Sequence, residues 1–111
     1  MLEATSRKAG KLAGEVAIPG DKSVSHRALM LGALAIGTTR IEGLLEGEDI
    51  LRTADAVQAM GATVERSDDG VWSVTGVGVG GLAEPEDVID MGNAGTGARL
   101  MMGVLAGHDM T

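Results

Sequence analysis

Cysteine is absent from this 111-residue chain, which excludes disulfide bonds, thiolate metal ligands and a cysteine nucleophile. The only aromatic residue is Trp72, and proline occurs just twice. The core must therefore be built from Leu, Val, Ile, Ala and Met, which pack through many small contacts. Because 44% of the residues are hydrophobic, the sequence can form one folded domain with a modest core.

The chain also lacks a long apolar run and a basic stripe. The longest apolar run, residues 28–36, is too short to cross a bilayer. Residues 1–14 lack the apolar centre of a secretory signal, so we expect a cytoplasmic protein without membrane contact. Nucleic-acid binding is not expected, because there is no basic stripe and no set of aromatic residues on which bases could stack.

Charge is distributed unevenly along the chain, whose net charge is −7. Residues 1–40 contain six basic and three acidic side chains, a net charge of +3, whereas residues 41–111 contain three basic and thirteen acidic ones, a net charge of −10. The basic N-terminal third could attract a small anion. The alternative is an ordinary solvated surface.

The pattern of apolar and turn-forming residues predicts an α/β fold with the element order β-α-β-α-β-β, followed by β-α. The expected strands are residues 16–18, 38–45, 62–66, 71–75 and 88–91, and the expected helices are residues 21–36, 48–60 and 94–106. The second half of the first helix is apolar on all sides, which predicts burial on most sides. The second helix is amphipathic, and Asp69-Gly70 indicates a hairpin between the third and fourth strands.

An internal repeat supports this assignment. At a shift of 72 residues, Gly20-Asp21 aligns with Gly92-Asn93, Arg27 with Arg99, and Met30 with Met102. One deletion later, residues 32–35 match residues 103–106. The chain therefore reads as one strand–helix unit followed by the beginning of a similar one.

The first candidate site is the segment 19–27, which begins a helix with Lys22, Ser23, His26 and Arg27 in its first two turns. Cations at this end oppose the helix dipole. A bound anion would remove the conflict by accepting hydrogen bonds from backbone N–H groups, hydroxyl, ammonium and guanidinium. The alternative is that the two long cations extend into water and Ser23 caps the helix.

The second candidate site is the glycine-rich run 92–97 with Arg99. Its spacing matches a Walker A loop, but Ala98-Arg99 occupies the place of Lys-Ser/Thr, which excludes a nucleotide-hydrolysing site. The run can still bind a ligand through exposed N–H groups at the start of a helix. The alternative is that its small residues allow two helices to pack closely. Residues 76–81 fit G-x-G-x-x-G without the helix that a dinucleotide site requires.

No metal site is expected, because His26 and His108 are far apart and have no suitably spaced partners. No cofactor is expected either. The acidic residues Glu46, Glu48 and Asp49 are interpreted as a solvated turn rather than as a general acid–base pair. The sequence therefore offers no catalytic residue.

The segments 19–27 and 92–99 resemble the first and second signatures of EPSP (5-enolpyruvylshikimate-3-phosphate) synthases. Residues 44–49 and 58–62 are also similar to that family, and the resemblance extends from Gly14 onward. The related UDP-N-acetylglucosamine enolpyruvyl transferases usually begin their first helix with Lys-Asn, which differs from Lys22-Ser23. The resemblance implies the β-α-β-α-β-β unit of this family over residues 14–82, after a tail (1–13) and before an incomplete second unit (83–111).

The resemblance also implies transfer of an enolpyruvyl group from phosphoenolpyruvate to shikimate 3-phosphate, without cofactor or metal. By position, Lys22 contacts both substrates, and Ser23 and Arg27 hold the shikimate ring substituents and carboxylate. Gly95, with Asn93 beside it, presents backbone to phosphoenolpyruvate. Residues 44–49 look more like the glyphosate-tolerant class, although Gly95 stands where tolerant members often have alanine.

Family members are roughly four times longer, so the groups that move protons lie outside this chain and we expect no activity from it alone. The alternative is a non-catalytic folded module that self-associates into a homo-oligomer or complements a missing remainder. Self-association would follow from an uncovered apolar face on the last helix. We expect that face to comprise Leu100, Met101, Val104 and Leu105.

Overall fold

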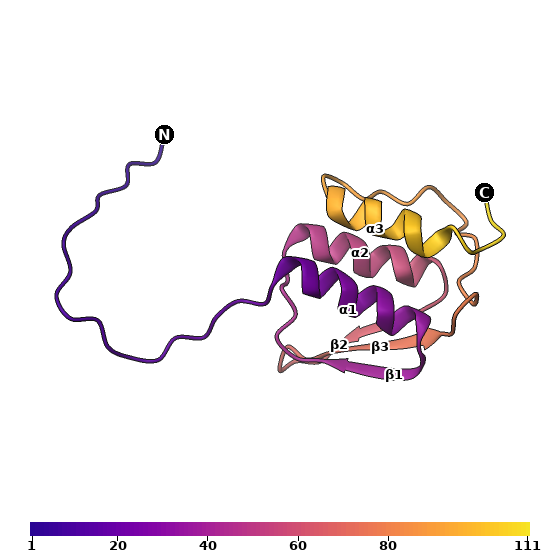
Figure 1. The fold of residues 1–111 in the computed structure, drawn as a ribbon, viewed down its shortest axis with the longest axis horizontal. Helices are drawn as coiled ribbons and strands as arrows, with labels where there is room; N and C mark the ends of the chain where they lie inside the picture. The colour runs from indigo at the N-terminus through magenta and orange to yellow at the C-terminus, as the bar shows by residue number, and fades with distance from the viewer.

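The structure, a computed structural model, describes all 111 residues and contains three helices and three strands (Figure 1). The helices are α1 (Lys22–Leu34), α2 (Glu48–Ala59) and α3 (Gly95–Leu105). The strands are β1 (Ile36–Ile41), β2 (Thr63–Arg66) and β3 (Trp72–Val77). The fold is mixed α/β, as the sequence predicts.

The three strands form one antiparallel sheet in the order β1-β3-β2. Thr75 of β3 lies between Thr38 of β1 and Thr63 of β2, which fixes the register of the whole sheet. The β2–β3 connection is the hairpin that the Asp-Gly pair predicts. Gly70 has a φ of +81°, and Ser67 and Val71 are joined by a backbone hydrogen bond of 2.9 Å.

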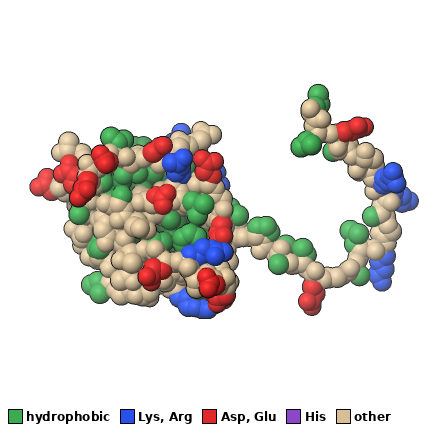
Figure 2. Space-filling model, turned by 180° about the vertical axis from the view of Figure 1, so that it is seen from behind, with side chains coloured by type: hydrophobic (Ala, Val, Ile, Leu, Met, Phe, Trp, Pro, Cys, Tyr) green, Lys and Arg blue, Asp and Glu red, His purple; other side chains and the backbone are tan.

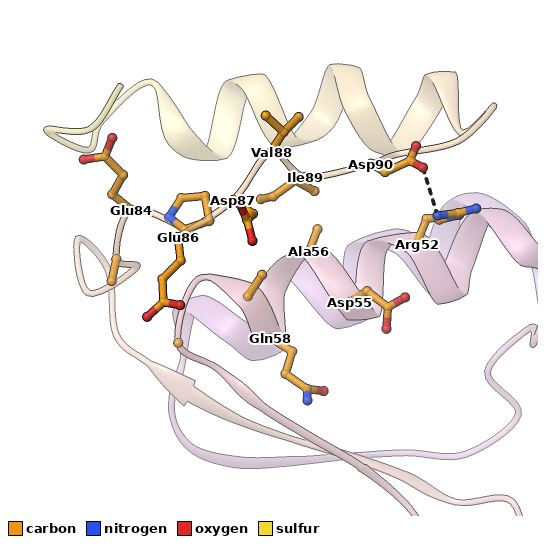
Figure 3. Close-up of a pocket in the computed structure, with 14 residues that line it drawn as sticks. Arg52, Asp55, Ala56, Gln58, Glu84, Glu86, Asp87, Val88, Ile89 and Asp90 are labelled. Atoms are coloured by element: carbon orange, nitrogen blue, oxygen red, sulfur yellow. Dashed lines mark ion pairs between the residues drawn. The ribbon is translucent and has the colours of Figure 1, made fainter.

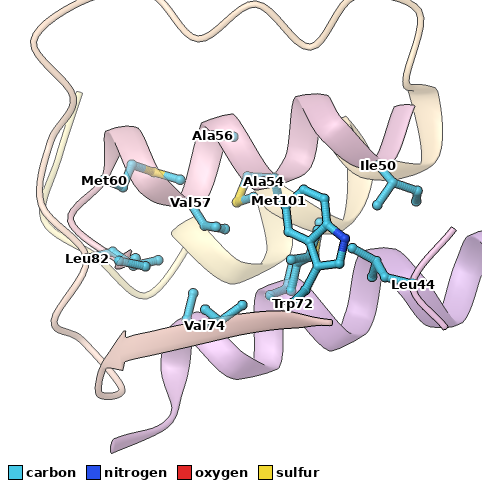
Figure 4. Packing of buried hydrophobic residues seen from close by; sticks show 14 residues of the cluster. Leu44, Ile50, Ala54, Ala56, Val57, Met60, Trp72, Val74, Leu82 and Met101 are labelled. Atoms are coloured by element: carbon cyan, nitrogen blue, oxygen red, sulfur yellow. The ribbon is translucent and has the colours of Figure 1, made fainter. Parts of the chain in front are cut away.

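The helices lie on one side of the sheet. α1 and α2 pack against the strands, whereas α3 packs mainly on α1 and α2 (Figure 1). The core between these layers is aliphatic apart from Trp72 at its edge (Figure 4). Its fully buried side chains include Leu29 from α1, Ile50 and Val57 from α2 and Val74 from β3.

The apolar second half of α1 is buried on most sides, as expected, but one side is exposed. Leu31 is 66% exposed, although its neighbours Met30 and Gly32 are buried. The sheet, α2 and α3 cover only the faces of α1 that they contact, and the remaining face is open to solvent. Helix burial depends on how many neighbours pack around it, which composition does not specify.

Two predicted strands do not form, and a third begins earlier than expected. Residues 16–18 and 88–91 have no regular structure, and the N-terminal segment extends away from the folded body, with residues 1–19 all exposed (Figures 1 and 2). Both segments have strand-like sequences but no partner strand, and a strand exists only when its backbone pairs. β1 starts at Ile36 rather than at residue 38, because Gly37 pairs with Gly76 instead of separating helix from strand.

None of the three helices has the length and apolar character that crossing a bilayer requires.

Candidate functional site

The N-terminal ends of all three helices lie at the same end of the molecule, because the helices run in nearly the same direction (Figure 1). This arrangement brings the two sets of predicted site residues to one end. Lys22, Ser23 and Arg27 come from the first two turns of α1, and Asn93 and Gly95 precede and begin α3. Helix N-termini present unpaired N–H groups and positive dipole ends, so this end favours negative ligands.

The start of α1 is firmly capped. Asp21 accepts a hydrogen bond of 2.8 Å from the backbone N–H of Val24, and the first turn contains no acidic residue. Lys22 forms an ion pair with Asp49 in the first turn of α2. Asp49 therefore offsets part of the repulsion between Lys22 and the positive end of the helix dipole. The sequence analysis assigned this role to a bound anion.

Ser23 and Arg27 lie on one exposed face of α1, as their spacing predicts. The Arg27 guanidinium donates a hydrogen bond of 3.0 Å to the backbone carbonyl of Ser23. This contact holds the guanidinium against the first turn of the helix. Arg27 is thereby placed close to the end of α1 where an anion would bind.

The start of α3 is open. Its N-cap, Ala94, supplies no side-chain hydrogen bond, and both Asn93 and Gly95 are exposed. A Cβ placed on Gly95 would meet only the Arg99 guanidinium, with Nη1 at 2.9 Å. The backbone at Gly95 is therefore accessible to a ligand, with a cation from the second turn of α3 beside it.

His26 is not one of the cations at this end, contrary to the sequence interpretation. Its side chain is fully buried, and Nδ1 lies 2.8 Å from Thr53 Oγ1 of α2. Burial lowers the pKa of His26, as do Lys22 and Arg27 to a smaller extent, whereas Asp49 raises it. The spacing of the buried stripe of α1, at positions 26, 29, 30 and 33, is the signal that could have identified this histidine as a core residue.

Gly97 brings α3 into close contact with the two other helices. A Cβ on Gly97 would lie 2.8 Å from Thr53 Oγ1 and 3.0 Å from His26 Cε1. The same Cβ would also lie 3.1 Å from Met91 Cε. The close-packing interpretation of the glycine-rich run is therefore correct at Gly97, and the accessible-backbone interpretation fits Gly95.

Loop 42–47 is tied to both α1 and the sheet. Ser25 Oγ accepts a hydrogen bond of 3.0 Å from the backbone of Leu45. Glu46 accepts hydrogen bonds from Arg66 at 2.5 Å and from the Trp72 indole at 2.7 Å, and these bonds lower its pKa. The acidic turn is thus not simply solvated: Glu46 and Asp49 have the partners described above, and the largely exposed Glu48 pairs with Arg52 at 3.6 Å.

A cleft of about 600 Å³ lies elsewhere, between α2 and the segment 83–90 (Figure 3). Arg52, which lines the cleft, pairs with Asp90 at 3.4 Å, and all the other charged lining residues are acidic. None of the five predicted site residues lines it. Its negative lining makes it unsuited to the anions that the helix ends favour.

The chain is similar to a segment of longer enzymes. A family model described as EPSP synthase (3-phosphoshikimate 1-carboxyvinyltransferase) matches residues 6–111. The chain belongs to the EPSP synthase family. The synthase of Rhodospirillum rubrum is 66% identical over 104 residues, which are 90% of this chain and 23% of that protein. The synthase of Paramagnetospirillum magneticum is 64% identical over 107 residues, covering 96% of this chain and 24% of that protein.

Solved structures of EPSP synthase show the same fold. The enzyme from Acinetobacter baumannii superposes with a TM-score of 0.80 at 46% sequence identity, covering 88% of this chain and 23% of that enzyme. The chain therefore spans about a quarter of the length of the EPSP synthases that it matches.

Proposed function

We propose that this chain carries part of the substrate site of an enolpyruvyl transferase, formed by the N-terminal ends of α1 and α3. The observation that carries the proposal is the placement of Lys22, Ser23 and Arg27 at the same end of the molecule as the open backbone of Gly95. The ligands are shikimate 3-phosphate and phosphoenolpyruvate, both multiply anionic, in the chorismate pathway of the cytoplasm. No cofactor or metal takes part.

Each residue has a distinct task in this proposal. Arg27 and Ser23 bind the carboxylate and ring substituents of shikimate 3-phosphate through guanidinium and hydroxyl. Gly95, with Asn93 beside it, presents its side-chain-free backbone to phosphoenolpyruvate. Lys22 contacts both substrates.

The ion pair of Lys22 with Asp49 is compatible with this task. An ammonium group has three N–H donors, and Asp49 leaves donors free for a ligand. The Lys22 side chain is 52% exposed, so a ligand can reach it from solvent. Asp49 orients the ammonium group toward the helix ends and also limits the net positive charge there.

Anion binding by the isolated chain tests the site directly. We expect weak affinity for inorganic phosphate, about millimolar or −4 kcal/mol, because few binding groups are present. Backbone amide signals of residues 21–27 should shift on titration, and Lys22→Ala should abolish the shifts. Lys11→Ala, in the exposed N-terminal segment, is the matched control. Shifts that survive Lys22→Ala would contradict the assignment.

We further propose that the isolated chain does not turn over its substrates, because proton transfer at carbon requires a placed acid and base. Neither has been assigned among these residues. The measurement is phosphate release from phosphoenolpyruvate that depends on shikimate 3-phosphate. Release above background by the purified chain would overturn this part of the proposal.

A second function, self-association or complementation by another part of the enzyme, is favoured by an apolar groove of about 770 Å³ beside α3. Met102 on its wall is 65% exposed and Val88 is 96% exposed. The apolar face differs from the expected one, because Met101 is buried in the core and Leu100 packs against it. Light scattering at rising concentration tests this function, and Met102→Gln should weaken the association.

The division into a tail (1–13), a first unit (14–82) and the start of a second unit (83–111) remains part of this proposal.

Placement in the glyphosate-tolerant class is also part of this proposal. Residues 44–49 favour the tolerant class. Gly95 favours glyphosate sensitivity, because glycine leaves room for an inhibitor longer than phosphoenolpyruvate. We expect a full-length enzyme with this segment to be inhibited by glyphosate.

A further inference from the structure

His26 lies between the two halves of the proposed anion site. It belongs to the second turn of α1, between Lys22 and Arg27 in sequence, and its ring contacts Gly97 in the first turn of α3. The ring is fully buried, as is Thr53 of α2, to which it is hydrogen-bonded. One imidazole thus joins the N-terminal regions of all three helices.

The hydrogen bonds around the ring favour one tautomer. Thr53 Oγ1 can donate to the backbone carbonyl of Asp49 at 3.5 Å, which leaves its lone pairs free to accept from His26 Nδ1–H at 2.8 Å. His26 Nε2 is buried and has no hydrogen-bond partner. In the Nδ1–H form this nitrogen carries a lone pair, whereas the other tautomer would bury an N–H donor without an acceptor.

Protonation of Nε2 would place a positive charge in this contact. The charged groups around it are Lys22 and Arg27 from α1 and Asp49 from α2, whose carboxylate is already paired with Lys22. α3 presents Gly97 to the ring, and its own cation, Arg99, lies beside Gly95. Burial outweighs the attraction of Asp49, so the pKa of His26 is lowered from its ordinary value near 6.5.

We propose that neutral His26 is a positioning residue that fixes the distance between the N-terminal ends of α1 and α3, and that its protonation loosens this contact. An imidazolium buried against Gly97 without an acceptor for Nε2–H must either move toward water or displace α3. The meaning of this contact for substrate binding rests on the proposed function. The contact itself can be measured without any ligand.

The sign of the pH effect on stability follows from the lowered pKa. The unfolded chain binds a proton at His26 more readily than the folded chain does. The free energy of unfolding therefore decreases as the pH falls below about 6.5, and it stops decreasing once the pH is below the folded-state pKa of His26. Above pH 6.5 the contribution of His26 is constant.

The first test is a ligand-free pH titration followed by nitrogen and amide NMR. We expect the ¹⁵N shifts of His26 to indicate the Nδ1–H form, and a transition below pH 6.5 to shift the amides of residues 22–27 and 95–99 together. His26→Asn, which can still reach Thr53, should remove this transition, and His108→Asn should leave it unchanged. A transition confined to α1, or one that persists in His26→Asn, would overturn the proposal.

The second test uses sulfate, whose charge is constant over this pH range. If protonation only added charge near the site, sulfate would bind more tightly at low pH. Loosening of the contact predicts the opposite, a several-fold weaker affinity below the His26 transition and no such loss in His26→Asn. Tighter binding at low pH would overturn the proposal. Absence of sulfate binding at every pH would instead count against the proposed function, and the ligand-free titration would still decide the role of His26.

Discussion

α1 and α3 occupy equivalent places in the internal repeat, yet only α1 is covered by a sheet. Met30 of α1 is 3% exposed, whereas the aligned Met102 of α3 is 65% exposed. A Cβ on Gly32 of α1 would meet Val74 of β3 at 3.1 Å, and one on the matching Gly103 of α3 would meet nothing within 4 Å. The same sequence pattern thus produces a buried helix in one place and a half-covered helix in the other.

The difference separates what a helix sequence decides locally from what its neighbours decide. Both helices close with an equivalent hydrogen bond: the N–H of Ala35 donates to Leu31 O at 2.9 Å, and that of the aligned Ala106 donates to Met102 O at 3.0 Å. The position of the last hydrogen bond is therefore shared by the two repeats, although α1 has 13 residues and an extended Ala35, whereas α3 has 11 residues and a helical Ala106. Burial is a property of the strands, and no strand packs against the Met102 face of α3.

The largest effect is expected where α1 meets loop 42–47. A Cβ on Gly20 would lie 2.1 Å from Gly43 O and 2.8 Å from Leu45 N, both backbone atoms that cannot move independently. We expect Gly20→Ala to lower the free energy of unfolding by about 3 kcal/mol. Chemical denaturation followed by circular dichroism measures it. Gly10→Ala, in the exposed N-terminal segment, is the control and should have no effect.

Two glycines of α3 distinguish its covered and uncovered faces. Gly97→Ala introduces a methyl group against Thr53 and His26, and we expect a loss of about 2 kcal/mol. Gly103→Ala introduces the same group into open space and should raise stability by about 0.5–1 kcal/mol through helix propensity. Thermal unfolding compares the two. Equal changes would mean that α3 does not pack at Gly97 as described.

The N-terminal ends differ in their caps. We expect Asp21→Ala to cost about 1 kcal/mol, because the hydrogen bond to the Val24 N–H is lost. The aligned Asn93→Ala should change stability by less than about 0.5 kcal/mol, because no side chain caps α3. Urea titrations of both variants provide the measurement, and a larger loss for Asn93→Ala would reverse the comparison.

The smallest effect on folding is expected at Gly95. The methyl group of Gly95→Ala would meet only the flexible end of Arg99, so stability should change by less than about 0.5 kcal/mol. In a full-length enzyme carrying this segment, we expect the same substitution to raise the inhibition constant of glyphosate markedly. Because the fold is hardly disturbed, the change can be attributed to the ligand pocket. Equal inhibition constants for the glycine and alanine enzymes would show that Gly95 does not line the part of the site where the inhibitor binds.

The sequence predicted the elements whose signals are local. α2 was placed to within one residue, because its amphipathic period, its acidic first turn and Gly61 all lie within the segment. The hairpin before β3 was found from Asp69-Gly70 alone. Residues 16–18 and 88–91 were wrongly assigned as strands, because a strand also requires a partner, and the sequence of the segment says nothing about one.

The candidate site was predicted in part for the same reason. The positions of Lys22 and Arg27 on α1 follow from helix periodicity. The ion pair with Asp49 and the contact of His26 with Thr53 and Gly97 depend on how the helices pack, and they join residues far apart in the chain. The sequence places three basic side chains at the start of α1, and in the folded structure one of them, His26, is buried in the core.

Trp72, held by Glu46 at the edge of the core, is a single optical probe built into the molecule. With no tyrosine or phenylalanine in the chain, all near-ultraviolet fluorescence comes from this one indole, which is 8% exposed. Its emission reports whether loop 42–47 is attached to the sheet, whereas the far-ultraviolet signal reports the helices. If the loop detaches before the helices melt, the two signals will change at different denaturant concentrations, and unfolding will not be two-state.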